Sequence, residues 1–77
     1  MQIYVNKEEP FKALKDQFSV APTTSGYQLA YSADKENFDV DTDAIVPAGE
    51  NLIYLGSMMY GWYKLSGNTD DNVLVIL

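Results

Sequence analysis

The sequence predicts an all-β fold, a small antiparallel β-sandwich or barrel of about seven or eight short strands. Three observations lead to this prediction. Apolar and polar residues alternate with a period of two, the alternating segments are short, and turn-forming residues separate them at regular intervals. The expected strands cover residues 2–6, 16–21, 26–33, 37–41, 43–46, 51–56, 60–66 and 72–77.

The strands differ in how much of their surface is apolar. Residues 2–5 and 27–32 alternate between apolar and polar, as half-buried strands do. Residues 52–55 and 73–77 are apolar throughout, so we expect them to be covered on both faces, by a second sheet and by a neighbour. The segment 73–77 is therefore either an interior strand of its own domain or a strand paired across a subunit boundary.

Turn chemistry separates the strands, and one segment has a helical alternative. Gly, Pro, Asn, Asp and Ser gather at residues 22–26, 34–37, 47–50, 56–57 and 66–72. Residues 8–16 could instead form a helical turn, since Phe11 and Leu14 lie three positions apart and Pro10 comes early. A helix of that length is unstable without packing.

Composition describes one acidic domain, residues 1–77, without repeats or linkers. The net charge of −6, with five lysines and no arginine, argues against binding to nucleic acid or to anionic membranes. The absence of Cys and His excludes disulfides, thiol catalysis, Ser-His-Asp chemistry and ordinary zinc sites. We expect no signal peptide, no membrane span, no cofactor and no enzymatic activity.

Small size points to assembly. The core of a chain of 77 residues rarely supplies more than ~3–5 kcal/mol of stability, and disulfides cannot add to it here. Oligomerisation, or docking on a larger partner, is therefore the leading expectation.

The acids Asp39, Asp41 and Asp43 match the first, third and fifth positions of a calcium loop. Ala44 stands where that loop requires glycine, and the flanking segments are expected to be strands rather than helices. We therefore expect no metal site but an exposed strand with its acids toward solvent and Val40 facing the other way. A weak calcium site of another type stays open, because acids at alternate positions share one face.

Aromatic residues and methionines supply the candidate contacts with a partner. Met58, Met59, Tyr60 and Trp62 form one group, and such side chains are favoured in interfaces. Alternation places Trp62 opposite Tyr63, so that Trp62 is exposed; the alternatives are a core tryptophan or one that stacks on a sugar. A second group lies in the N-terminal segment, residues 1–25: Ile3, Tyr4, Phe11 and Leu14.

Three stretches resemble small virion proteins of tailed bacteriophages, of the capsid-decoration or head-fibre type found in phages of gut Bacteroidetes. They are Gly26–Asp34 (GYQLAYSAD), Ile45–Asn51 (IVPAGEN) and Gly61–Thr69 (GWYKLSGNT). Lys35 departs from the pattern, since glycine would suit the turn after Asp34. The chain has no room for the longer receptor-facing part of a head fibre, so a decoration module fits better.

The resemblance implies a structural role. Such proteins are compact β-domains on the capsid surface, often trimers, which implies a capsid protein and further copies of the chain as partners. The expected location is the virion, after synthesis in the host cytoplasm. The alternative from the residues is a monomeric carbohydrate- or ligand-binding module that uses Trp62 and Tyr60 as a stacking platform.

If Trp62 lies in an interface, Trp62→Ala is expected to weaken assembly while the monomer fold stays nearly intact. Light scattering measures the native mass and circular dichroism the fold. Unfolding of the variant would instead place Trp62 in the core.

Overall fold

A computed structural model of the chain describes residues 1–56 and 61–77, and the side chains in these ranges except those of Thr42 and Asp43. The predicted all-β fold is confirmed: the described residues form antiparallel strands and no helix. The strands are β1 (Gln2–Asn6), β2 (Phe11–Lys12), β3 (Gln17–Ala21), β4 (Tyr27–Ser32), β5 (Asp39–Val46), β6 (Asn51–Tyr54), β7 (Trp62–Ser66) and β8 (Asn72–Ile76). None of the described residues belongs to a helix long and apolar enough to cross a membrane.

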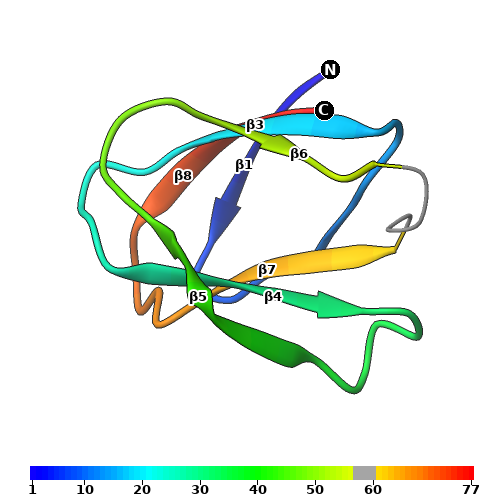
Figure 1. The fold of residues 1–77 in the computed structure, drawn as a ribbon. Coiled ribbons are helices and arrows are strands. Elements are labelled where there is room, and N and C mark those ends of the chain that lie inside the picture. The colour runs from blue at the N-terminus through cyan, green and yellow to red at the C-terminus, as the bar shows by residue number, and fades with distance from the viewer. Residues whose placement is uncertain (57–60) are drawn as a thin grey trace.

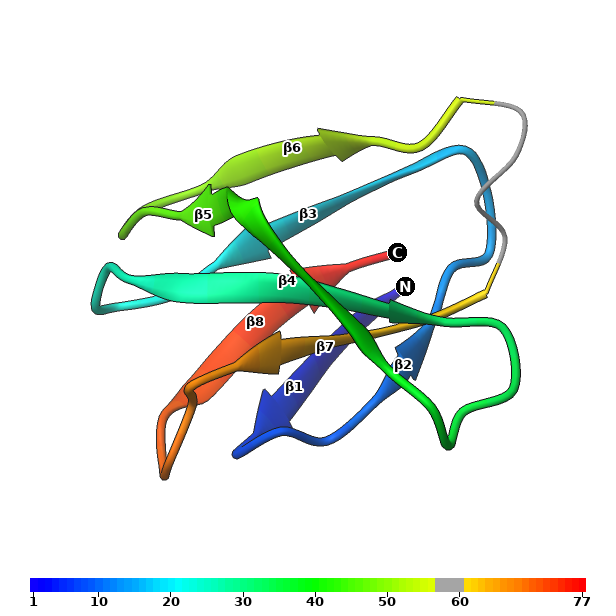
Figure 2. The same cartoon turned by 60° about the horizontal axis from the view of Figure 1, so that its bottom comes forward.

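The strands form two four-stranded sheets packed face to face (Figure 1). Sheet A has the order β1-β8-β3-β6 and sheet B the order β2-β7-β4-β5. β1 pairs with β8, β2 with β7, β3 with β6 and β4 with β5, so the chain is one long hairpin folded over on itself. This strand order is that of a jelly roll. Figure 2 shows how the folding sends successive pairs to opposite sheets.

The core lies between the two sheets and contains an aromatic cluster. Phe11 of β2, Phe18 of β3 and Tyr63 of β7 are buried. The ring centroid of Phe18 lies 5.1 Å from the ring centroid of each of the other two. Edge-to-face packing of such rings adds to the free energy gained from burial alone. Burial raises the pKa of Tyr63 to about 12. Branched and aliphatic side chains complete the core: Val5, Val20, Val46, Leu65, Val73 and Val75.

β8 is an interior strand, which answers the question left open for residues 73–77. It lies between β1 and β3, pairing with both. Val73 and Val75 point into the core, whereas Leu74 and Ile76 point outward and stay partly exposed. Within one chain the other sheet covers one face of this strand, and the expected cover of the other face by a neighbour stays a prediction. The first and last residues meet beside it, where the Leu77 amide donates to the Met1 carbonyl at 2.8 Å.

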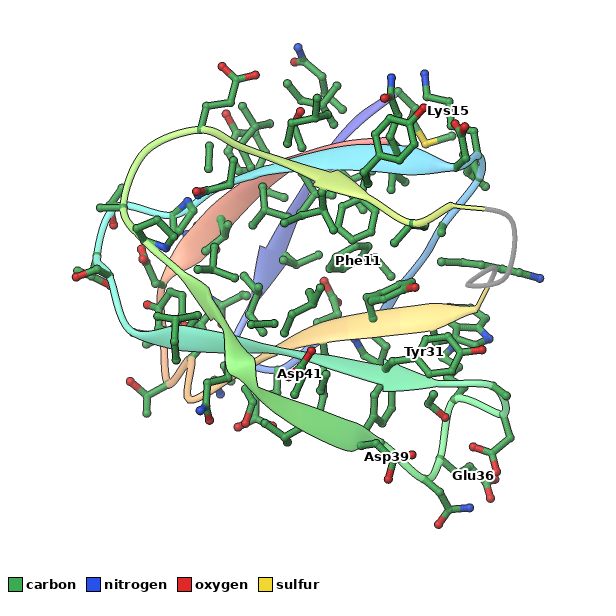
Figure 3. The ribbon with its side chains drawn as sticks, in the orientation of Figure 1. Phe11, Lys15, Tyr31, Glu36, Asp39 and Asp41 are labelled. Carbon is green, nitrogen blue, oxygen red and sulfur yellow. The ribbon has the colours of Figure 1, made fainter. Side chains whose placement is uncertain are left out.

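The helical alternative for residues 8–16 is not observed. Phe11 and Lys12 form β2 and pair with Tyr63 and Trp62 of β7. Pairing supplies hydrogen bonds that a short helix could not keep in water, and it places Phe11 between the sheets (Figure 3). Phe11 was an interface candidate; at 3% exposure it is a core residue and cannot contact a partner.

The two strands expected over residues 37–46 are one strand, β5, with an irregular middle. The segment from Gln28 to Ala30 of β4 lies opposite the longer segment from Val40 to Ile45. Such bulges twist a strand at the edge of a sheet. Asp39 and Asp41 are exposed as expected (Figure 3). Val40 is 42% exposed, so its expected burial is corrected.

Phe11→Ala should destabilise the protein by about 3–5 kcal/mol, because it removes a buried ring from the aromatic cluster. Leu14→Ala is the matched control, since Leu14 is 57% exposed and its loss should change stability by less than about 0.5 kcal/mol. Urea unfolding followed by circular dichroism measures both. Equal effects of the two substitutions would contradict the burial of Phe11.

Candidate functional site

The strands of sheet A contain no charged side chain. Their sequences are QIYVN, QFSVA, NLIY and NVLVI, although 21% of the chain is charged. One face of this sheet packs on the core, which explains the absence of charge there. The other face has no layer over it among the described residues, and a solvated face ordinarily carries charge.

Strand register places a set of apolar side chains on this outer face. Tyr4, Leu74 and Ala21 lie in one row across β1, β8 and β3. Ile76, Ser19 and Leu52 lie in the next row, and Tyr54 of β6 follows beside Gln17. We define the outer face of sheet A by its apolar members, Tyr4, Ala21, Leu52, Tyr54, Leu74 and Ile76; its other positions are Gln, Asn and Ser.

The large side chains of this face are exposed. Tyr4 is 68%, Leu52 63% and Tyr54 70% exposed, and they come from the two edge strands β1 and β6. Leu74 and Ile76 fill the middle and are half-buried. Scattered exposed apolar residues are ordinary, but a contiguous uncharged patch of this kind marks an interaction surface.

The edges of the two sheets also differ. β1 and β6 contain no lysine, proline or bulge, the devices that usually prevent a strand from joining another edge. In sheet B the edge strand β5 carries Asp39 and Asp41 and is irregular, while β2 has two residues and follows Pro10. Sheet B is thus protected against edge contacts, and sheet A is not.

Trp62 lies on the outer face of sheet B among lysines. It is half-buried, with the Lys35 ammonium 4.4 Å and the Lys12 ammonium 5.9 Å from its ring centroid. Next to it Lys64 forms an ion pair with Glu8 at 2.9 Å. The hydrogen bond from Lys64 lowers the pKa of Glu8, and a second one from the Gly67 amide adds to the effect. This surface is charged and mixed, unlike the outer face of sheet A.

The structure separates the predicted contact residues. Met58, Met59 and Tyr60 lie outside the described residues. Trp62 is not part of the buried core, and Leu14 is exposed. Of the N-terminal group, Tyr4 belongs to the outer face of sheet A, and Ile3 points the opposite way and packs against the core.

Sequence reasoning missed Leu52 and Tyr54. Residues 52–55 were expected to be covered on both faces, but only Ile53 and Leu55 pack against the core. No signal in the sequence separates this exposed pair from Ile53 and Leu55, because the order of strands in sheet A is known only from the fold.

The stretches that carry the phage resemblance each build a turn. Asn51 donates from its side chain to the carbonyls of Pro47 and Gly49, both at 2.9 Å. Asn68, which is 3% exposed, donates to the Asp71 carbonyl and accepts from its amide. Amides that bond to nearby backbone in this way stabilise tight turns. These residues therefore explain the fold rather than a binding site.

Asp34 organises the third turn, which joins β4 to β5. Its carboxylate accepts hydrogen bonds from the amides of Asn37 and Glu36 and from the Ser32 hydroxyl, at 2.7–2.9 Å. The bond from the Asn37 amide, then those from Ser32 and Glu36, hold the pKa of Asp34 well below its ordinary value of 3.8. Lys35 follows with a φ of 70°, which is the left-handed geometry that glycine would suit.

Within residues 1–56 and 61–77, no group of three or more acids is placed to hold a metal, and no pocket is found. The side chain of Asp43 lies outside the description, so the alternative of a weak calcium site at these acids stays a prediction. The chain matches none of the protein-family models, curated proteins or solved structures with which it was compared.

Lowering the pH should weaken the turn at Asp34. Because its pKa is depressed in the folded state, this carboxylate stabilises the protein above the unfolded pKa of about 3.8, and the contribution is lost as pH falls toward the folded pKa. The Asp34→Asn variant lacks this carboxylate. Its free energy of unfolding should therefore fall less than that of the wild type between pH 5 and pH 2.

Asp70→Asn, at an exposed aspartate in another turn, is the control for that measurement. Urea unfolding at a series of pH values compares the three proteins. A wild-type pH dependence that survives unchanged in Asp34→Asn would contradict the role given to this carboxylate.

Proposed function

We propose that the chain is a non-enzymatic structural protein of a virion, which self-associates and docks on the capsid of a tailed bacteriophage as a decoration module. The single observation that carries the proposal is the uncharged, exposed outer face of sheet A. A protein that acts alone in solution gains nothing from such a face, whereas an assembly subunit requires one.

The size of this face sets the free energy that covering it can supply. Tyr4, Leu52 and Tyr54 together expose on the order of 400 Å². At ~25 cal/mol per Å², covering that area is worth ~10 kcal/mol before the costs of association are subtracted. Only the surplus over those costs stabilises an assembly.

The resemblance, and not the fold, favours the virion over a lectin-like role. Jelly rolls occur in viral capsid proteins and also in lectins, so the fold alone favours neither role. The resemblance to decoration proteins favours the virion, with a capsid protein and further copies, a trimer first among them, as partners. Synthesis in the host cytoplasm followed by location on the capsid surface is part of this proposal.

A monomeric carbohydrate- or ligand-binding module is the second candidate. The observation that favours it is the half-exposed Trp62 beside Lys12 and Lys35, an aromatic platform with donors at its rim. Trp62 is the only tryptophan of the chain, so its fluorescence reports directly on binding at this surface.

Mass spectrometry of gradient-purified particles of the phage that encodes this chain tests the first proposal. The chain should be present in a fixed ratio to the major capsid protein, and a phage lacking the coding sequence provides the control. Its absence from purified particles would overturn the virion role. Quenching of Trp62 fluorescence by a neutral or acidic glycan, lost in Trp62→Phe, would favour the second candidate instead.

A further inference from the structure

We infer that the outer face of sheet A is covered by a second copy of this chain. The inference rests on the proposed function in one respect, because it assigns the self-association part of that role to this surface and to no other. Docking on a capsid would then use another part of the molecule. The charge distribution, the size of the face and the open strand edges support the assignment.

Charge favours a second copy over a charged partner. Each copy carries a net charge of −6, so two copies repel one another wherever acidic surfaces meet. A contact from which charge is excluded avoids this repulsion and therefore favours self-association. The outer face of sheet A meets this condition, because all sixteen charged side chains lie outside the four strands of that sheet.

A neutral face also has nothing with which to attract a basic or acidic partner. A contact between two different proteins usually gains its specificity from electrostatic complementarity. A contact between identical subunits can instead match apolar surface with apolar surface.

The area of the face suits a contact between two copies. The three most exposed side chains supply on the order of 400 Å² on each copy. Adding the half-buried Leu74 and Ile76 and the small polar positions brings the total for two copies to roughly 1,000 Å² or more, the lower limit of a specific interface. Large side chains lie on the edge strands, Tyr4 on β1 and Leu52 and Tyr54 on β6. The small side chains of Ser19 and Ala21 on β3 lie between them.

The open edges fit the same occupant. β1 and β6 are the edges of sheet A, and each has an uncharged sequence without proline or bulge. In an antiparallel sheet of four strands the two edge strands run in opposite directions. The β6 edge of one copy can therefore meet the β1 edge of the next in an antiparallel arrangement. Such an edge contact continues sheet A into a further copy and adds to the contact that covers its outer face.

Introducing a positive charge on the outer face of one sheet or the other tests the inference. Leu52→Lys and Tyr4→Lys place a charge on the outer face of sheet A at positions that are 63% and 68% exposed, so the fold should survive. Ile45→Lys is the matched control, because Ile45 is an exposed apolar residue, 52% exposed, on the outer face of sheet B. Light scattering and sedimentation equilibrium from micromolar to submillimolar concentration measure the association, and circular dichroism measures the fold.

The wild-type chain should associate, each sheet A variant should raise the dissociation constant about tenfold or more, and Ile45→Lys should leave it unchanged. Raising the salt concentration should strengthen wild-type association, because salt screens repulsion between acidic copies and removes no attraction from a neutral contact. A contact between the lysines around Trp62 and the acids of another copy would instead weaken with salt.

A wild-type chain that stays monomeric, association that persists in the Leu52→Lys and Tyr4→Lys double variant, or equal loss in Ile45→Lys would each overturn the inference. These outcomes are separate from the virion test. A monomeric chain found in purified particles would contradict self-association and keep the capsid role, and an associating chain absent from particles would do the reverse.

Discussion

The apolar contact between the inner faces of two four-stranded sheets is the interaction on which the rest of this protein depends. Phe11, Phe18 and Tyr63 occupy one part of that contact, and aliphatic side chains from both sheets, such as Val20 and Leu65, fill the rest. Two layers are all that 77 residues can build, so each sheet has one face that the chain itself leaves uncovered. What those two outer faces carry decides what the molecule can do.

The two outer faces differ in charge and in the strands at their edges. Sheet B carries lysines, an ion pair between Glu8 and Lys64, and a tryptophan shielded by cations. Its edges are short, acidic or irregular. Sheet A carries tyrosine, leucine and isoleucine with no charge, and its edges are regular. The difference follows from composition strand by strand, and it makes one side of the sandwich compatible with water and the other suited to a contact.

The turns explain how so short a chain reaches this arrangement. The chain is a single hairpin folded over, so its path depends on a few tight reversals. Asp34, Asn51 and Asn68 each bond to backbone or side-chain groups within their own turn. Left-handed residues, Lys35 and Gly49 among them, complete the reversals. Asp34, Asn51 and Asn68 also lie in the three stretches on which the proposed likeness to phage decoration proteins rests, so these stretches report on turn geometry.

The sequence by itself determined the fold class, the turns and most strand positions, because period-two alternation and turn chemistry are local properties. It also predicted the exposure of Asp39 and Asp41. Only the tertiary structure decided that residues 8–16 contribute a strand and not a helix, since the pairing partner of Phe11 lies more than fifty positions away in Tyr63. Only the tertiary structure decided which side of an all-apolar strand faces water. Leu52 and Leu74 are as apolar as Ile53 and Val73, and no local pattern separates them. The packing of the two sheets separates them, because each strand turns one face toward the other sheet and the opposite face toward solvent.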